Sequence, residues 1–181
     1  MNLKTNRLLL REITIDDIPS IHALNSLAEI DQYNTAGIPA DIKETEQLII
    51  PIIHDQLVQP RPRYVWYLTD ADNEFVGLVG VVMGKQKYES SEIWYKIHPT
   101  HWTKGFATEV VQTILHFCFT ELKLHRITAG CATENMASIR VLEKCGFTRE
   151  GRCRKILPIR GQWVDNFEYA ILEEDYFKVK L

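Results

Sequence analysis

Apolar positions along the chain change between a period of two, which is typical of strands, and a period of three to four, which is typical of helices. The segment "NRLLLREITIDD" (6–17) opens with an apolar run that predicts a strand. A helix is expected directly after it, because Asp16 or Asp17 can cap the first turn and Pro19 fits inside that turn.

A second helical region is expected over 41–60, where Asp41 is a suitable N-cap and Pro51 predicts a kink or a break. Strands follow, and a turn rich in Asp and Asn joins the first two of them. They are expected at 63–70, 75–84 and 90–99.

The second half of the chain alternates helices with strands and closes with a hairpin. Asn135 is a good N-cap for one of these helices, and Gly146 stands where a left-handed C-terminal residue is needed. The order of elements predicts an α/β (α+β) fold with a mixed sheet rather than a doubly wound one. The expected elements are a helix at about 105–122, a strand at 125–132, a helix at 134–147, and two strands within 148–177 around a turn at Arg160–Gly161.

The size of the chain, 181 residues and 21.0 kDa, predicts a single domain over 1–181 that needs neither metals nor disulfides for its core. The longest apolar stretch, "FVGLVGVVM" (75–83), has the length of a strand, and the N-terminus lacks the apolar region of a signal peptide. The four cysteines have no Cys-x-x-Cys spacing, which indicates buried thiols in a reducing compartment. We therefore expect a cytoplasmic protein without a membrane span.

Charge is distributed unevenly along the chain. The formal net charge of −3 argues against a general nucleic-acid binder. Residues 101–161 hold ten Lys/Arg and five Asp/Glu, a net +5, whereas the remainder holds eleven and nineteen, a net −8. A positive segment in an acidic chain suits a small polyanionic ligand, although an ordinary solvated surface gives the same pattern.

Gly105 marks the start of the helix expected at 105–122. The first backbone N–H groups of a helix lack partners inside the helix, and the helix dipole adds about half a positive charge there. Gly105 and the small Ala107 leave room for phosphate oxygens, while Lys104 adds charge and Thr108 adds a hydroxyl. Alone this signal is weak, because the segment lacks both the Gly-x-Gly-x-x-Gly fingerprint and the Lys-Ser/Thr of a P-loop.

Together with a second motif downstream, this region resembles the GNAT superfamily of N-acetyltransferases, and more narrowly its Rim-type (RimJ/RimL-like) branch of protein N-terminal acetyltransferases. The pyrophosphate motif of the family, Gln/Arg-x-x-Gly-x-Gly/Ala, is matched by Trp102, Gly105 and Ala107. Tryptophan in the first position is usual in the Rim-type branch. Its common form, Trp-Gly-Lys-Gly-Tyr-Ala-Thr-Glu, differs here at Thr103 and Phe106.

The second motif, Asn-x-x-Ser-x-x-x-Leu-Glu-Lys-x-Gly-Phe, matches throughout 135–147, and weaker resemblance extends to 5–13 and 161–176. The resemblance implies a GNAT fold, with a twisted mixed sheet of about seven strands and helices on both faces. It also implies acetyl-CoA as co-substrate, no metal, and transfer of the acetyl group to a primary amine by direct attack. No cysteine has a visible activating partner, which fits a mechanism without a covalent enzyme intermediate.

The resemblance further implies which residues bind acetyl-CoA. In this family a backbone N–H at the end of the fourth strand polarises the thioester carbonyl, which matches Ile97–His98 here. A preorganised donor of this kind typically contributes about 2.7–4 kcal/mol. The residues expected to hold the phosphates are Lys104, Gly105, Phe106, Ala107 and Thr108.

The departing thiolate needs a proton or a hydrogen bond. Many family members use a tyrosine seven residues after the capping asparagine, but that position is Leu142 here. Ser138 lies one turn earlier on the same helical face, and the resemblance implies that its hydroxyl contacts the sulfur, the alternative being a role in capping. Asn135 caps its helix, binds the pantetheine arm or does both, and Lys144 either pairs with a phosphate or is solvated.

Glu92 is the candidate general base, because this family often carries a glutamate on this strand that relays a proton through water. If the opposite face of the strand is core, Glu92 faces either solvent or the substrate. Alternation places Glu92, Trp94 and Lys96 on one face and Ile93, Tyr95 and Ile97 on the other.

Other polar residues are weaker candidates. His98 and His101 lie in a connection, where a lone histidine is usually just exposed. The histidines and cysteines form no metal-ligand pattern. Asp165 and Glu168 either meet the substrate amine or are exposed hairpin residues, and we expect the second.

The acceptor amine is left open by the sequence. A protein α-amine of the ribosomal-protein type is the best-known substrate of the branch, but small amines and antibiotics are alternatives, as is a non-catalytic acyl-CoA-binding regulatory module. A nucleotide-phosphate binder is disfavoured by the match at 135–147. Residues 26–62, which usually shape the acceptor site in this fold, hold the fewest signals. The expected partners are acetyl-CoA and an amine, without nucleic acid or membrane, and the chain is expected as a monomer or homodimer.

Overall fold

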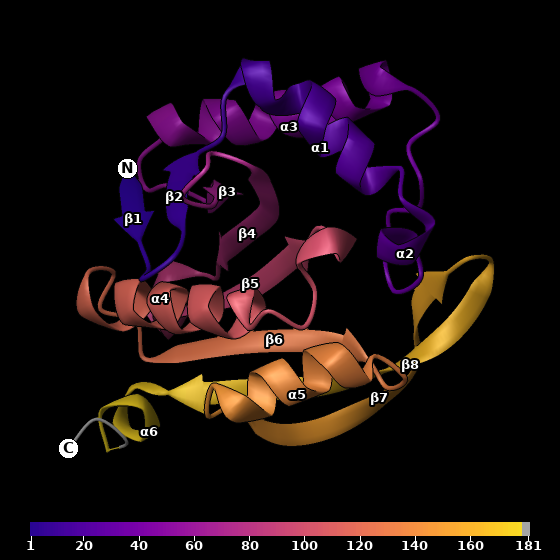
Figure 1. Cartoon of the computed structure of the whole chain (residues 1–181). Coiled ribbons are helices and arrows are strands. Elements are labelled where there is room, and N and C mark those ends of the chain that lie inside the picture. The colour runs from indigo at the N-terminus through magenta and orange to yellow at the C-terminus, as the bar shows by residue number, and fades with distance from the viewer. Residues whose placement is uncertain (179–181) are drawn as a thin grey trace.

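The computed structural model describes residues 1–178, which form an eight-stranded sheet (Figure 1). Its strands are β1 (Asn2–Lys4), β2 (Leu9–Glu12), β3 (Arg63–Thr69), β4 (Phe75–Met83), β5 (Ser90–Ile97), β6 (Arg126–Ala132), β7 (Thr148–Ile159) and β8 (Gln162–Leu172). They lie in the order β1-β2-β3-β4-β5-β6-β8-β7, and only β5 and β6 are parallel neighbours. The predicted mixed sheet is confirmed, with one strand more than the expected seven or so.

Helices cover both faces of this sheet. Within residues 1–178 they are α1 (Ile18–Asn25), α2 (Ala28–Asp31), α3 (Ile42–His54), α4 (Phe106–Thr120), α5 (Met136–Lys144) and α6 (Glu173–Lys178). Figure 1 shows α1 and α3 side by side above the strands of the N-terminal half, with α4 and α5 along the opposite side. The prediction of helices on both faces is therefore confirmed.

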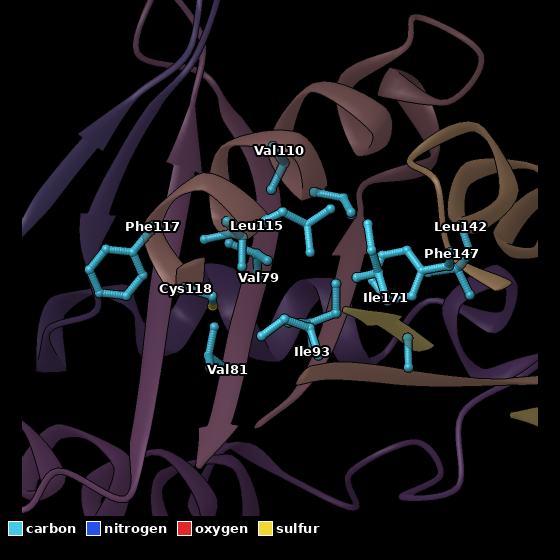
Figure 2. Close-up of a cluster of buried hydrophobic side chains, with 14 of the residues drawn as sticks. Val79, Val81, Ile93, Val110, Leu115, Phe117, Cys118, Leu142, Phe147 and Ile171 are labelled. Carbon is cyan, nitrogen blue, oxygen red and sulfur yellow. The ribbon is translucent and has the colours of Figure 1, made fainter. Parts of the chain in front are cut away.

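The larger core lies between the sheet and the helices α4 and α5 (Figure 2). The apolar face of α4 contributes Val110, Leu115 and Cys118, which meet Val79 and Ile93 of the central strands. All five side chains are buried. Burying one aliphatic side chain of this size contributes about 1.5–3 kcal/mol, so this packing fixes the position of α4 over β4 and β5.

A second core lies on the other face, under α1 and α3. Ile21 and Leu24 of α1 and Ile49 of α3 pack here against Val65 and Leu78 of β3 and β4. The strands β3 and β4 are buried on both faces, which explains their continuous apolar sequence.

The strands β5 and β6 separate after a short stretch of pairing. Their parallel register joins Ser90, Ser91 and Glu92 to residues 126–128 and then ends. β5 continues five residues further, to Ile97, and β6 continues to Ala132. We call the space between the two unpaired strand ends the β5–β6 opening.

Several local predictions are confirmed and others need correction. Asn135 caps α5, and Gly146 adopts the left-handed conformation with φ of 89°. The helix expected over 41–60 runs through Pro51 and ends at His54. The helices α2 and α6 were not expected: α2 lies in the segment with the fewest signals, and α6 follows β8 without a breaking residue.

Candidate active site

The end of β5 presents a backbone N–H to the β5–β6 opening. The N–H of His98 donates to Val76 O at 2.8 Å, on the β4 side of the strand. Successive N–H groups of a strand point to opposite edges, so the N–H of Ile97 points to the side of β6. The Ile97 carbonyl accepts a hydrogen bond from Trp102 Nε1 at 2.7 Å, which ties the following connection to the strand end. Of the two expected residues, Ile97 therefore presents its N–H to the opening, and the N–H of His98 is engaged.

The helix α4 begins beside this strand end without an acidic cap. Gly105 is its N-cap residue and has φ of 82°, a left-handed conformation that glycine adopts without strain. The first intrahelical hydrogen bond is accepted by the Gly105 carbonyl, so the N–H groups of Phe106, Ala107 and Thr108 have no carbonyl partner within the helix. Lys104 and Gly105 are exposed. The five residues expected to hold phosphates thus form one open helix start.

Arg7 braces this helix start, a contact that the sequence did not suggest. Its Nε donates to Glu109 Oε2 at 2.7 Å, and its Nη1 donates to Lys104 O at 3.0 Å. The guanidinium carbon lies 4.4 Å from the centre of the Phe106 ring. Thr5 also donates to Glu109. The segment before β2 is therefore attached to the first turn of α4.

These contacts compensate the negative charge of Glu109, the acidic side chain in the first turn of α4. Burial alone would raise the pKa of Glu109, but hydrogen bonds from Thr5 and Arg7 outweigh it and lower the pKa. A Cβ at Gly105 would lie 3.5 Å from Arg7 Nη2, so the guanidinium borders the place where phosphates are expected. The net result is an exposed, positively polarised end of α4.

The helix α5 places two hydroxyl groups together. Asn135 Oδ1 accepts from the Ser138 N–H at 3.1 Å, which confirms its capping role. The Ser138 Oγ lies 2.9 Å from the hydroxyl of Tyr95, which comes from β5. Leu142, at the position where many relatives carry tyrosine, is fully buried in the core. The structure thus supplies a tyrosine beside Ser138 from a different element.

Thiols near these hydroxyls stay protonated at neutral pH. Burial raises the pKa of Cys131 to about 11, although a hydrogen bond with Ser138 opposes the rise. Burial also raises the pKa of Cys145 to about 12 and that of Cys118 to about 12. None of these three cysteines has the low pKa that a nucleophilic thiolate needs.

Glu92 lies on the opposite face of β5 from Tyr95, as the alternation predicted. Its register partner is Thr128 on β6. Thr128, Gly130 and Glu168 follow on the same face, because register partners across a sheet point to the same side and Gly130 pairs with Glu168. Glu92 is exposed, but its neighbours displace part of the water around the carboxylate, which raises its pKa, and the nearby Glu168 carboxylate raises it further.

An unpaired oxygen lies next to these two carboxylates. Asn166 is 5% exposed and donates through Nδ2 to Glu168. Its Oδ1 is buried and has no hydrogen-bond partner within residues 1–178. A Cβ on Gly130 would lie 2.9 Å from Asn166 Nδ2, so glycine there makes room for this amide. We call the surface formed by Glu92, Glu168 and Asn166 the acidic face.

Asp165 does not belong to the acidic face. It is buried rather than exposed, against expectation, and its carboxylate accepts from Arg152 Nε at 2.7 Å and from the Lys155 N–H at 2.9 Å. These bonds lower its pKa, the bond from the Lys155 backbone foremost. Asp165 therefore holds the β7–β8 hairpin together.

Lys96 joins β5 to α1 on the same side as Glu92. Its Nζ donates to Asn25 Oδ1 at 2.8 Å. Burial lowers its pKa to about 8, because the charged ammonium loses hydration that one amide oxygen does not replace. This buried lysine was noted in the sequence only as part of the alternation.

The remaining sequence candidates lie at the edge of the site. His98 Nδ1 is 2.8 Å from the Thr100 hydroxyl, and the pKa of His101 is lowered by burial and by the charge of Lys104. Lys144 is exposed in the last turn of α5. Its neighbour Cys145 points its sulfur at the carbonyl of Thr108, 3.7 Å away, so the end of α5 adjoins the start of α4.

The part of the chain that the structure describes has neither a metal-binding cluster nor a membrane-spanning helix. No group of three or more His, Cys, Asp or Glu side chains within residues 1–178 is arranged to hold a metal ion. No helix in the same range has the length and apolar character needed to cross a bilayer.

An open, positively polarised helix start beside a strand that diverges from its parallel neighbour is typical of proteins that bind a phosphate-bearing ligand. Comparison with known families agrees, because residues 7–148 match the acetyltransferase (GNAT) domain. The chain belongs to the GNAT acetyltransferase family and is an acetyl-CoA-dependent N-acetyltransferase.

Relatives with similar sequences span the whole chain. It is 32% identical to the uncharacterized N-acetyltransferase YnaD of Bacillus subtilis, covering 97% of this chain and 99% of the relative. It is also 32% identical to the spermidine N(1)-acetyltransferase of Vibrio cholerae, covering 94% and 96%. These relatives show the GNAT family but do not distinguish a branch within it.

Solved structures show the same fold. A GNAT-family acetyltransferase from Bacillus anthracis matches with a TM-score of 0.81 at 31% identity, covering 96% of this chain and 99% of the other. The Vibrio cholerae spermidine N-acetyltransferase in complex with CoA and spermine matches with a TM-score of 0.84 at 30% identity, covering 94% and 98%.

Proposed function

We propose that this acetyltransferase acts on a small primary amine that carries more than one positive charge. The observation that carries this proposal is the acidic face, where the neighbouring Glu92 and Glu168 carboxylates offer acceptor oxygens to an ammonium group. The spermidine N(1)-acetyltransferase of Vibrio cholerae among the relatives supports the same class of acceptor.

The proposed reaction is direct attack of the amine on the thioester. The amine nitrogen bonds to the carbonyl carbon, the oxygen gains negative charge next to the Ile97 N–H, and the C–S bond then breaks. The departing thiolate takes the hydrogen of the Ser138 hydroxyl. Cys118, Cys131 and Cys145 stay neutral thiols, which supports a path without a cysteine acyl intermediate.

The amine nitrogen loses two protons in this scheme: the first, from the ammonium, goes to Glu92 before attack, and the second goes to solvent as the amide forms. Glu92 precedes Ile97 by five residues on an extended strand, roughly 16 Å, so water must carry the proton between them. A carboxylate with a raised pKa accepts a proton more readily than an ordinary one, and partial desolvation and Glu168 supply that rise.

The second candidate acceptor is a protein α-amine, as in the Rim-type branch. Ser138 in the role of the missing tyrosine and Trp102 in the pyrophosphate motif favour it. An α-amine has a pKa near ~8, so it needs less help from a base than an alkylamine near ~10.4.

We further propose that residues 1–181 act as a single cytoplasmic domain, as monomer or homodimer. The strand β1 and the helix α6, which lie outside the matched 7–148, pack onto the same sheet and its larger core. The four cysteines are free thiols, as in proteins of reducing compartments.

Thiol release from acetyl-CoA over a panel of amines tests the proposed function. Putrescine and butylamine form the matched pair, because they share the reactive amine and the four-carbon chain and differ in one charge. We expect a KM at least tenfold lower for putrescine, with spermidine similar or better. A peptide with a free N-terminus that outperforms the polyamines would favour the Rim-type alternative. Calorimetric binding of acetyl-CoA without thiol release from any amine would favour a regulatory module.

A further inference from the structure

The hydrogen bond between the hydroxyls of Tyr95 and Ser138 has a preferred donor, and this preference matters for the proposed chemistry. The Tyr95 hydroxyl lies 2.9 Å from Ser138 Oγ and 3.4 Å from the Ser138 carbonyl oxygen. A tyrosine hydroxyl has one hydrogen, and a carbonyl can only accept. Tyr95 thus faces two acceptor atoms of the same residue, which favours Tyr95 as the donor and Ser138 Oγ as the acceptor.

The direction of this bond decides what Ser138 can do. A serine hydroxyl also has one hydrogen. If Ser138 donated to Tyr95, it would have no hydrogen for a sulfur atom. When Tyr95 donates instead, the Ser138 hydrogen remains available for the sulfur of CoA.

Burial keeps Tyr95 in the donor form. Its ring packs against the larger core, and burial raises the pKa of its hydroxyl well above the usual value, with the bond to Ser138 opposing the rise. The hydroxyl therefore keeps its hydrogen at neutral pH. Ser138 is fixed from the other side by the bond from its N–H to Asn135.

We propose that Tyr95 is a positioning residue that holds Ser138 as the proton donor to the CoA thiolate. This inference rests on the proposed role of Ser138. As the C–S bond breaks, the sulfur takes the Ser138 hydrogen, and the developing negative charge on Ser138 Oγ is stabilised by the hydrogen bond that Tyr95 donates. The second proton that the amine nitrogen loses reaches Ser138 through solvent before the next cycle, so no net proton is gained or lost by the pair.

The Tyr95–Ser138 pair supplies the proton donor that Leu142 cannot. A tyrosine at 142 would donate directly to the sulfur. In this chain the Ser138 hydroxyl donates to the sulfur, and the Tyr95 hydroxyl, which comes from β5, donates to Ser138. The pair also crosses from β5 to α5 at the β5–β6 opening, where the thioester is expected.

A double-mutant cycle of Tyr95→Phe and Ser138→Ala tests the proposal, with thiol release measured for the best amine of the panel. We expect Ser138→Ala to lower kcat about 100-fold and Tyr95→Phe about tenfold, each with the KM for acetyl-CoA unchanged within twofold. Since Tyr95 acts only through Ser138, Tyr95→Phe in the Ser138→Ala background should lower kcat by less than twofold.

Tyr64→Phe is the matched control. Tyr64 on β3 packs against the same core, and the substitution removes the same kind of hydroxyl group. It should keep wild-type kinetics. Independent, multiplying effects of the two substitutions, or unchanged kcat in Tyr95→Phe, would overturn the positioning role. Unchanged kcat in Ser138→Ala would remove Ser138 from the mechanism and the inference with it. Absence of turnover with every amine would instead contradict the proposed function itself.

Discussion

Gly105 shows how one residue connects backbone geometry to binding. Its φ of 82° and its exposure place a bare backbone at the start of α4. We expect Gly105→Glu to abolish acetyl-CoA binding in calorimetry, because the new carboxylate repels the phosphates and its side chain occupies their place. Gly161→Glu is the control, since Gly161 also has a positive φ, of 73°, but lies in the hairpin turn. Unchanged affinity in Gly105→Glu would place the phosphates elsewhere.

Glu92 offers a prediction that depends on pH. Its pKa is raised by partial desolvation and by Glu168, so it is deprotonated and able to act as a base only above that raised value. Glu92→Gln should lower kcat about 100-fold at neutral pH, and the loss should disappear near pH ~10.4, where an alkylamine is deprotonated in solution. A pH–rate profile parallel to that of the wild type would remove Glu92 from the mechanism.

Glu168→Gln provides the complementary measurement. Removal of its negative charge lowers the pKa of Glu92, so the acidic limb of the pH–rate profile should move to lower pH. The same substitution should raise the KM for a diamine more than that for a monoamine. An unchanged acidic limb would mean that another group sets it.

Single-residue predictions from the sequence succeeded where the local pattern was sufficient. Asn135 and Gly146 cap α5 as expected, because capping depends on neighbours within one turn. The choice between Ile97 and His98 needed the register of β5 on β4, which residue types do not specify. Asp165 was expected to be exposed, but its partners Arg152 and Lys155 come from the facing strand.

At the scale of elements, Lys96 couples β5 to α1 at a cost in stability. Its pKa is 10.5 in the unfolded chain and about 8 in the fold, and this difference corresponds to about 3 kcal/mol. Below pH 8 the lysine is charged in both states and the full cost applies, whereas above 10.5 it is neutral in both and the cost vanishes. Stability of the wild type should therefore rise between these two values.

Lys96→Met removes the cost of the charged ammonium but also loses the hydrogen bond to Asn25. The variant should therefore be more stable than the wild type by about 1–2 kcal/mol at pH 7, less than the full cost. Its free energy of unfolding by urea should lack the rise between pH 8 and 10.5. Lys43→Met, at an exposed position of α3, should change neither quantity. A destabilised Lys96→Met with an unchanged pH profile would mean that the ammonium is well compensated in the fold.

Arg7 couples the start of the chain to α4. Arg7→Ala frees the Glu109 carboxylate near the phosphate site and removes the bond to Lys104 O. We expect acetyl-CoA affinity to fall about tenfold in calorimetry. Arg7→Ala combined with Glu109→Gln should recover most of the loss, because the unpaired negative charge is gone. No recovery would mean that Arg7 contacts the phosphates itself.

The sequence pattern predicted most elements of the fold but few contacts between them. Strands and long helices follow from periodicity, and the alternation along β5 predicted the opposite faces of Glu92 and Tyr95 correctly. Arg7 and Glu109 are 102 residues apart, and Tyr95 and Ser138 are 43 apart. Such pairs arise from topology, so a sequence without an alignment cannot specify them.

At the scale of the whole molecule, the proposed donor and the proposed cationic acceptor require opposite charges, and the fold offers them on opposite sides of β5. The exposed start of α4 is positively polarised, and the acidic face lies on the side of α1 and α3. The net +5 of residues 101–161 within a chain of −3 follows the same division. The sequence indicated the positive half, but the acidic face is assembled from β5 and β8 and became visible only in the fold.

The tip of the β7–β8 hairpin contacts α2, which lies in the segment expected to shape the acceptor site. Arg160 Nε lies 2.8 Å from Asp31 Oδ2, and its Nη2 donates to Ala28 O at 2.6 Å, across about 130 residues of sequence. Arg160→Ala should loosen α2 and raise the KM for the acceptor about tenfold, while acetyl-CoA affinity stays within twofold. Arg154→Ala, on the exposed part of β7, is the matched control and should change neither. If Arg160→Ala instead weakened acetyl-CoA binding and left the acceptor KM unchanged, the hairpin would belong to the donor side, and residues 26–62 would not shape acceptor specificity.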